Sequence, residues 1–168
     1  MDKKILVAYA SKYGATAEIA RRIGAALEKA GLLVEVLPAE RVKDPSAYQA
    51  VILGSAVYAG QWRKEAAEFL QAHEQTLKGL PVWLFSSGPT GEGDPVELMK
   101  GWRFPETLQA AADRIGPRDT AFFMGDIDMQ KLNLPEKMIV KAIKAPTGDF
   151  RDWDSIESWA ASIAEELK

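Results

Sequence analysis

One short segment, between a strand-like apolar run and a helical pattern, combines hydroxyl groups, a lysine and a glycine in a way that suits phosphate binding. It consists of Ser11, Lys12, Tyr13, Gly14, Ala15 and Thr16. The first N–H groups of a helix lack partners within the helix and lie at the positive end of its dipole, so they favour an anion. The segment could instead be an ordinary helix start, with Thr16 as the N-cap and Gly14 in the turn. It matches neither G-x-G-x-x-G nor G-x-x-x-x-G-K-[ST], which argues against a dinucleotide loop or a P-loop.

Two further segments are also rich in small residues, glycine and hydroxyl groups. Residues 54–62 carry Tyr58 and Trp62, whose rings could form a wall for a flat ligand or could pack against neighbouring helices. Residues 86–94 contain serine, threonine and glycine without any aromatic side chain, and could be a ligand loop or a surface turn. Each segment alone is ambiguous, so its significance depends on where the fold places it.

The chain offers few side chains for catalysis. It has no cysteine and a single histidine, His73, which excludes thiolate nucleophiles, histidine triads and multi-histidine metal centres. His73 follows Phe69 on a predicted helix and is expected to pack there. Glu92 and Asp94 lie in the third segment, but loop carboxylates are usually solvated, so we assign no catalytic side chain and no metal ligand. Any chemistry is therefore expected to come from a bound cofactor.

Strand and helix patterns alternate along the chain, which predicts an α/β fold with a parallel sheet covered on both faces. The predicted strands are residues 4–9, 32–37, 50–53, 82–85 and 120–124. The main predicted helices are residues 16–30, 63–77, 105–115 and 152–167. A length of 168 residues suits one domain, residues 1–168. These elements indicate a doubly wound five-stranded sheet, for which the order 2-1-3-4-5 is the common one.

That strand order gives the three segments a common location. Ligands of open α/β sheets bind at the carboxyl ends of the strands, where the strand order reverses. Here the reversal lies between strands one and three, with strand four beside them, and the three segments follow these three strands. We therefore expect the three loops to converge on one ligand site.

An insert of residues 125–150 follows strand five. Its central part, residues 127–146, contains four lysines against Asp128 and Glu136, a net charge of +2 that leaves −5 for the rest of the chain. Met138, Ile139 and Ile143 could form an apolar stripe on a helix between Pro135 and Pro146. Such a helix could lie on an anionic membrane, or could dock on the protein with its lysines in solvent.

The bulk properties limit the class of protein further. A net charge of −3 argues against broad nucleic-acid binding, which needs a basic face. The apolar run at residues 5–10 is too short for a signal peptide or a membrane span. Together with the absence of cysteine, this favours a cytoplasmic location.

At the first loop the chain resembles the flavodoxin superfamily, whose phosphate loop reads [TS]-x-[TS]-G-x-T; Tyr13 departs from that pattern. The resemblance implies that FMN is the cofactor and that residues 11–16 hold its phosphate. It implies that the isoalloxazine ring is bordered by Ala56, Val57, Tyr58, Ala59, Gly60, Ser87, Gly88, Pro89, Thr90 and Gly91. The branch that contains menaquinone-dependent protoporphyrinogen dehydrogenase is the most similar, through Lys12, residues 51–60 and the insert.

The resemblance implies an FMN-dependent oxidoreductase acting on a small-molecule or quinone electron acceptor. The third loop has no aromatic residue to cover the ring, so one face would be open unless Trp102 or Phe104 fills the gap. In flavodoxins a peptide of the second loop turns to accept a hydrogen bond from the reduced ring, and Ala59–Gly60 is the matching peptide. Two alternatives remain, an electron carrier serving a redox partner protein and a flavin-free binding or regulatory module.

Overall fold

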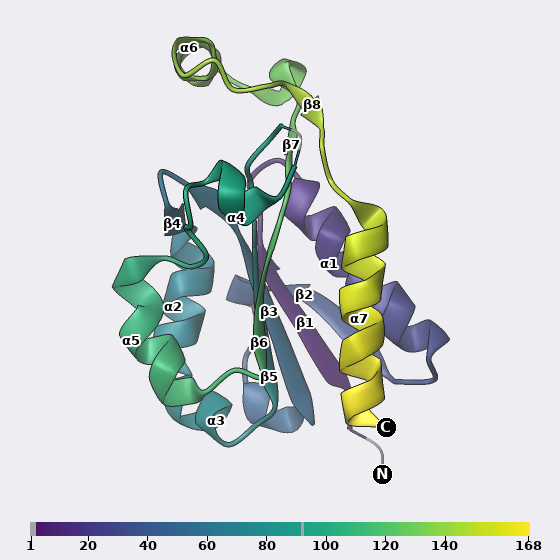
Figure 1. Cartoon of the computed structure of the whole chain (residues 1–168). Coiled ribbons are helices and arrows are strands. Elements are labelled where there is room, and N and C mark those ends of the chain that lie inside the picture. The colour runs from purple at the N-terminus through teal and green to yellow at the C-terminus, as the bar shows by residue number, and fades with distance from the viewer. Residues whose placement is uncertain (1–2, 92) are drawn as a thin grey trace.

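The computed structural model describes residues 3–91 and 93–168, and its centre is a parallel β-sheet (Figure 1). The long strands are β1 (Ile5–Ala10), β2 (Val34–Pro38), β3 (Ala50–Tyr58), β5 (Val82–Ser87) and β6 (Asp119–Phe123). They pair in the order β2-β1-β3-β5-β6, and the two-residue strand β4 (Gln61–Trp62) pairs antiparallel with β3. Counted along the chain, the five parallel strands have the order 2-1-3-4-5, which confirms the predicted topology.

Helices cover both faces of the sheet, as Figure 1 shows. One face carries α1 (Ala15–Lys29) and α7 (Trp153–Leu167), and the other carries α2 (Lys64–Ala72), α3 (Glu74–Lys78) and α5 (Glu106–Ile115). Because side chains alternate along a strand, β1 contributes Ile5 and Val7 to one core and Leu6 and Ala8 to the other. All four side chains are buried, which explains why this strand is an unbroken apolar run.

Several predicted boundaries differ from the structure: β5 continues to Ser87 instead of ending at Phe85, and β2 begins at Val34 instead of Leu32. Two further differences have a clear structural cause. Strand β3 continues to Tyr58 instead of ending at Leu53, because Gly54 is not a strand end: it pairs with Phe85, and a Cβ at Gly54 would lie 2.0 Å from the Cζ atom of that ring. The predicted helix over residues 63–77 is two helices, because His73 between them has non-helical angles of φ −109° and ψ 18°. The His73 ring packs on Phe69 at 4.8 Å between centroids, as expected from its position.

The insert after β6 lies beyond the carboxyl ends of the strands (Figure 1). Its two ends pair as β7 (Asp126–Ile127) and β8 (Gly148–Asp149), and between them lie a 3₁₀ turn at Met129–Lys131 and the helix α6 (Leu134–Ala142). The remaining short elements are α4 (Pro95–Leu98) and 3₁₀ turns at Ala39–Arg41 and Pro45–Ala47. Among the helices formed by the described residues, none is long and apolar enough to cross a bilayer.

Candidate functional site at the carboxyl ends of the strands

The three predicted loops meet at one edge of the sheet. Strand pairing places Ala10 next to Ser55 and Ala56 next to Ser87, so the ends of β1, β3 and β5 are neighbours. A hydrogen bond of 2.8 Å between the hydroxyl oxygens of Thr16 and Ser87 connects the first loop to the third. The predicted convergence of the loops is confirmed, although residues 55–58 and 86–87 belong to strands instead of loops.

The first loop is built to leave the start of α1 open. Gly14 is the N-cap residue in a left-handed conformation (φ 94°, ψ −10°), and its N–H donates to the Ser11 hydroxyl oxygen at 3.1 Å. A Cβ at Gly14 would meet nothing within 4 Å. Thr16 is therefore not the N-cap: it lies in the first turn of α1, buried beside Ser87. Because the first N–H groups of α1 have no acceptor inside the helix, this end of the helix can bind an anion.

The second loop is a tight β-hairpin. Tyr58 pairs with Gln61, which leaves only Ala59 (φ 50°) and Gly60 (φ 76°) in the turn. Two positive φ angles in a two-residue loop are those of a type I′ turn, whose twist matches that of the flanking strands. Tyr58 is exposed at the tip of β3.

The aromatic residues near this hairpin divide into two groups. Trp62 is buried, donates from Nε1 to the Ser86 hydroxyl at 2.8 Å, and packs edge-on against Phe104 at 5.1 Å between centroids. These two rings therefore belong to the core, so Trp62 is no exposed wall. Trp102 instead packs on Phe122 at 4.8 Å, and its Nε1 lies 3.6 Å from where a Cβ of Gly60 would be. Trp102 therefore lies beside the turn of the second loop, whereas Phe104 packs on Trp62 in the core.

The third loop is fixed by close packing against the start of the insert. The Gly125 N–H donates to the Pro89 carbonyl at 2.7 Å, and a Cβ at Gly125 would lie 2.8 Å from the carbonyl oxygen of Gly88. Thr90 is buried, and Gly91 has a φ of 129°. Next in the chain, Glu92 lies outside the described residues. Asp94 is exposed and caps α4 by accepting from the Val96 N–H at 3.0 Å.

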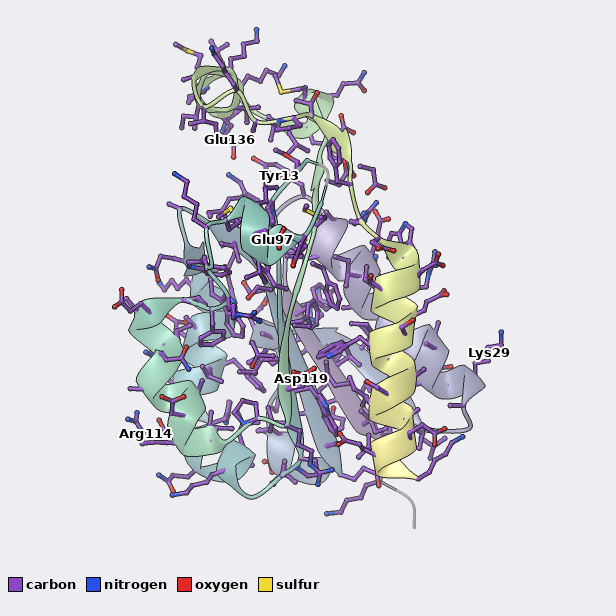
Figure 2. All side chains as sticks on the ribbon, in the orientation of Figure 1. Tyr13, Lys29, Glu97, Arg114, Asp119 and Glu136 are labelled. Carbon is purple, nitrogen blue, oxygen red and sulfur yellow. The ribbon has the colours of Figure 1, made fainter. Side chains whose placement is uncertain are left out.

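Glu136 of α6 contacts the first loop, a feature that sequence reasoning missed. Its carboxylate accepts from Lys12 Nζ at 2.7 Å and from the Tyr13 hydroxyl, and Figure 2 shows it extending from α6 toward Tyr13. Glu136 also forms a capping box with Asn133. The N-x-x-E capping pattern is visible in the sequence, but nothing local indicates a partner more than 120 residues away.

The contacts of Glu136 shift its titration. Hydrogen bonds from Lys12, from Tyr13 and from the backbone of Asn133 lower the pKa of Glu136 to about 2. The same pairing with Glu136 raises the pKa of Lys12. Because the folded pKa is below the ordinary value of 4.5, the contact stabilises the fold above that pH and is lost as the pH falls toward about 2. At neutral pH the ion pair is therefore fully formed.

We expect Glu136→Gln to loosen the insert, because a neutral amide cannot form the ion pair with the Lys12 ammonium. Trypsin should cleave the variant at the insert lysines about two- to fivefold faster than the parent chain at neutral pH. The matched control is Glu157→Gln on α7, which removes an exposed ion pair with Arg22 of α1 (2.9 Å in the parent) and should leave that cleavage unchanged. Equal cleavage of all three proteins would contradict a role of Glu136 in holding the insert.

Arg151 anchors the base of the insert next to the first loop. Its side chain is only 6% exposed and pairs with Asp149 at 2.7 Å, Glu18 at 3.3 Å and Asp126 at 3.6 Å. It also donates to the carbonyl oxygen of Ala15 at 3.2 Å. The start of α1 is thus tied through one guanidinium to both strands of the β7–β8 pair. Sequence reasoning gave Arg151 no role, since its partners are distributed over the chain.

Two cavities lie away from the three loops. One, of about 420 Å³, is lined by residues of α5 and its flanking loops, including Phe104, Gln109 and Asp113. The other, of about 360 Å³, is lined by residues 126–130 with Thr147 and Gly148. Neither is lined by residues of the first, second or third loop.

Comparison with known proteins agrees with this geometry. A family described as a flavodoxin domain matches residues 6–154. A curated relative, protoporphyrinogen IX dehydrogenase [quinone] of Escherichia coli K12, is 22% identical over 177 residues, covering 96% of this chain and 94% of the relative.

Solved structures resemble the whole fold at low sequence identity. A flavodoxin from the domain Archaea superposes with a TM-score of 0.62 at 16% identity, covering 98% of both chains. Flavodoxin 1 of Bacillus cereus has a TM-score of 0.65 at 16% identity, with coverage of 98% of this chain and 99% of the other. A short-chain flavodoxin associated with a bacterial microcompartment has a TM-score of 0.66 at 14% identity over both full chains. These likenesses concern the fold.

Proposed function

Because this chain belongs to the flavodoxin-domain family, we propose that it binds FMN at the carboxyl ends of its strands and transfers electrons through it. The observation that carries the proposal is the open start of α1, which faces the second and third loops with Lys12 beside it. When bound, FMN would supply one- or two-electron redox chemistry, for which the chain has no side chain of its own.

The residues of the first loop fit a phosphate group. The N–H groups of the first turn of α1 would donate to it. The Lys12 ammonium is paired with Glu136, so it would add positive charge at the phosphate only by leaving that carboxylate. The Ser11 hydroxyl accepts from Gly14, which leaves its proton free to donate. In the Thr16–Ser87 pair one hydroxyl proton is shared between the two oxygens, so the other remains available. Residues 11–16 are therefore our candidates for phosphate binding, with the Tyr13 side chain turned to Glu136 instead.

The second and third loops would hold the flat ring. Residues 56–60 and 87–91 would border it, with Tyr58 and Trp102 as the aromatic side chains within reach of the hairpin. The carbonyl of Ala59 would turn to accept a hydrogen bond from the reduced ring. This rotation changes the backbone angles of residue 60, which already has a positive φ, and glycine is the residue that allows such a change at little steric cost. We assign no general acid or base among the side chains.

Substitution of Gly60 tests that role. Gly60→Ala is expected to lower the reduction potential of the bound flavin, because a Cβ at a φ of 76° restricts the peptide and weakens the hydrogen bond that favours the reduced state. Gly31→Ala is the matched control: its φ is 97°, its added Cβ meets nothing within 4 Å, and it lies at the end of α1 away from the site. A potentiometric titration compares the two variants with the parent. An equal potential in all three would contradict the assignment.

We further propose a dehydrogenase that passes electrons to a quinone. Support comes from the relative whose name is protoporphyrinogen IX dehydrogenase [quinone], which aligns over nearly the whole chain. The third loop adds support, since residues 86–94 contain no aromatic side chain to cover the flavin, which leaves Trp102 beside Gly60 as the ring that would have to do so. An open face would allow a small molecule to reach the flavin directly.

A second candidate is an electron carrier that serves a protein partner, and it is favoured by the flavodoxins among the similar structures. Anaerobic mixing of the FMN-loaded chain with protoporphyrinogen and menadione separates the two functions. Turnover supports the dehydrogenase, whereas reduction by a flavodoxin reductase without turnover supports the carrier.

The first experiment is an absorbance spectrum of the purified chain, followed by chromatography of the flavin released by heat. A yellow protein that releases about one FMN per chain would support the proposal. A colourless protein that does not take up added FMN would reject it and favour a flavin-free binding module.

A further inference from the structure

The helix α6 presents an apolar face to solvent. Leu134, Met138, Ile139 and Ile143 are exposed by 70%, 63%, 60% and 68%, the highest exposures among the described large apolar residues. None of the described residues of α6 is buried. The helix therefore does not dock its apolar stripe on the body of the protein, which was one of the two interpretations of the sequence.

The orientation of α6 is fixed by the side of the helix opposite the apolar face, which contacts the first loop. At about 100° per residue, Leu134, Met138, Ile139 and Ile143 fall within one half of the helix, and Glu136, Lys137 and Val140 fall in the other. The three residues of the second group are the partly buried ones, and Glu136 holds this side to Lys12 and Tyr13. The apolar half therefore faces away from the first loop and the sheet.

Lysines border the apolar face. Lys137 and Lys141 lie along one edge of the helix and Lys144 follows it. Lys131, which precedes the helix, is turned instead to the Tyr13 carbonyl oxygen at 3.4 Å. The single acid of the helix, Glu136, is already neutralised by Lys12. The apolar face of this helix is complementary to the acyl chains of a bilayer, and the lysines at its edge are complementary to anionic lipid headgroups.

We propose that α6 docks this chain on an anionic lipid bilayer, with its apolar half at the level of the acyl chains and its lysines at the phosphates. A second copy of the chain is a poorer occupant. In an antiparallel two-fold pair of these helices the lysine edge would face the same lysine edge. A nine-residue helix is also only about 14 Å long, too short to supply the roughly 800 Å² that each partner of a stable dimer buries.

Docking through α6 would bring the candidate flavin site close to the lipid. The helix lies at the same end of the molecule as the three loops, and Glu136 connects it to the first of them. If the proposed function holds, the electron acceptor that fits this placement is a lipophilic quinone dissolved in the bilayer. This last step rests on the proposed function, whereas the docking itself does not.

The test uses the full chain and sucrose-loaded vesicles that are sedimented at low salt. One set is pure phosphatidylcholine, and the other contains about one third phosphatidylglycerol. We expect the parent chain to bind the anionic vesicles at least about tenfold more tightly than the neutral ones, and Met138→Ser/Ile139→Ser to lose about tenfold or more of that binding. Leu33→Ser is the matched control: Leu33 is also an exposed apolar residue, but it immediately precedes β2, outside the insert.

Several results would overturn the proposal. These are failure of the parent chain to bind anionic vesicles, equal binding to neutral vesicles, equal binding by the double variant, and a dimer on gel filtration that the double variant loses. The flavin experiment is separate. A colourless chain that still binds vesicles would reject the proposed function alone, and a yellow chain that does not bind them would reject the docking alone.

Discussion

The Ala15→Asp variant is expected to bind FMN at least about a hundredfold more weakly than the parent chain while folding normally. Ala15 is the first residue of α1. A carboxylate there would interact favourably with the first N–H groups of the helix and with its dipole, so the helix itself should not suffer. The same carboxylate would repel the phosphate of FMN. Two like charges about 4 Å apart at an effective dielectric constant near 20 repel by about 4 kcal/mol, and each 1.4 kcal/mol is about tenfold in affinity.

Fluorescence quenching of FMN on titration with protein measures this affinity, and thermal unfolding of the apoprotein checks the fold. Ala110→Asp is the control, because it adds the same charge at an exposed position of α5. It should bind FMN as the parent chain does. If Ala15→Asp retains an affinity within about threefold of the parent, the phosphate does not bind at the start of α1 and the proposed site is wrong.

Removal of the Phe85 ring is expected to have the largest effect on stability. Phe85 is fully buried in the centre of the sheet, and its ring covers Gly54 of the neighbouring strand. It also meets Phe123 and Trp159 at 6.1 and 6.0 Å between centroids. Phe85→Ala should therefore lower the free energy of unfolding by about 3–5 kcal/mol, as measured by urea denaturation.

A double-mutant cycle with Gly54 tests the cause of that loss. In the parent chain, Gly54→Ala should destabilise by about 1–3 kcal/mol, because its Cβ would overlap the Phe85 ring. In the Phe85→Ala background the same methyl group has room and fills part of the cavity, so its cost should disappear. Additive effects of the two substitutions would contradict direct packing of the ring on the glycine.

The fold could be predicted from the sequence wherever its cause is local. The alternating strand and helix patterns were sufficient to predict a parallel sheet. Right-handed crossovers leave few possible topologies, and the observed strand order is the common one among them. The end of β3 could not be predicted from the sequence. Position 54 is a glycine because the ring of Phe85, 31 positions later, occupies the space that a side chain would need, and not because the chain turns there. In the same way, the sequence allowed Trp62 to be an exposed aromatic side chain beside a ligand. In the structure Trp62 is buried, where it donates a hydrogen bond to Ser86 and packs on Phe104.

The candidate site shows the same division. The strand order was enough to predict that the three loops meet, because that meeting depends on topology alone. The contact between Glu136 and the first loop depends on how the insert folds back over the strand ends. Its charges were visible in the sequence, but no periodicity relates Glu136 to Lys12. Contacts of this kind require the three-dimensional arrangement.

The pairing of β7 with β8 has a consequence for how such a protein can evolve. Ile127 and Gly148 are paired, so the chain leaves and re-enters the body at one point. The β7–β8 pair is held by Arg151, and the strands of the main sheet do not depend on what lies between. A segment attached in this way can be lengthened, shortened or exchanged with little change to the loop-closure entropy or to the sheet. The insert is thus a replaceable module, whose length and surface can change while the sheet beneath it stays the same.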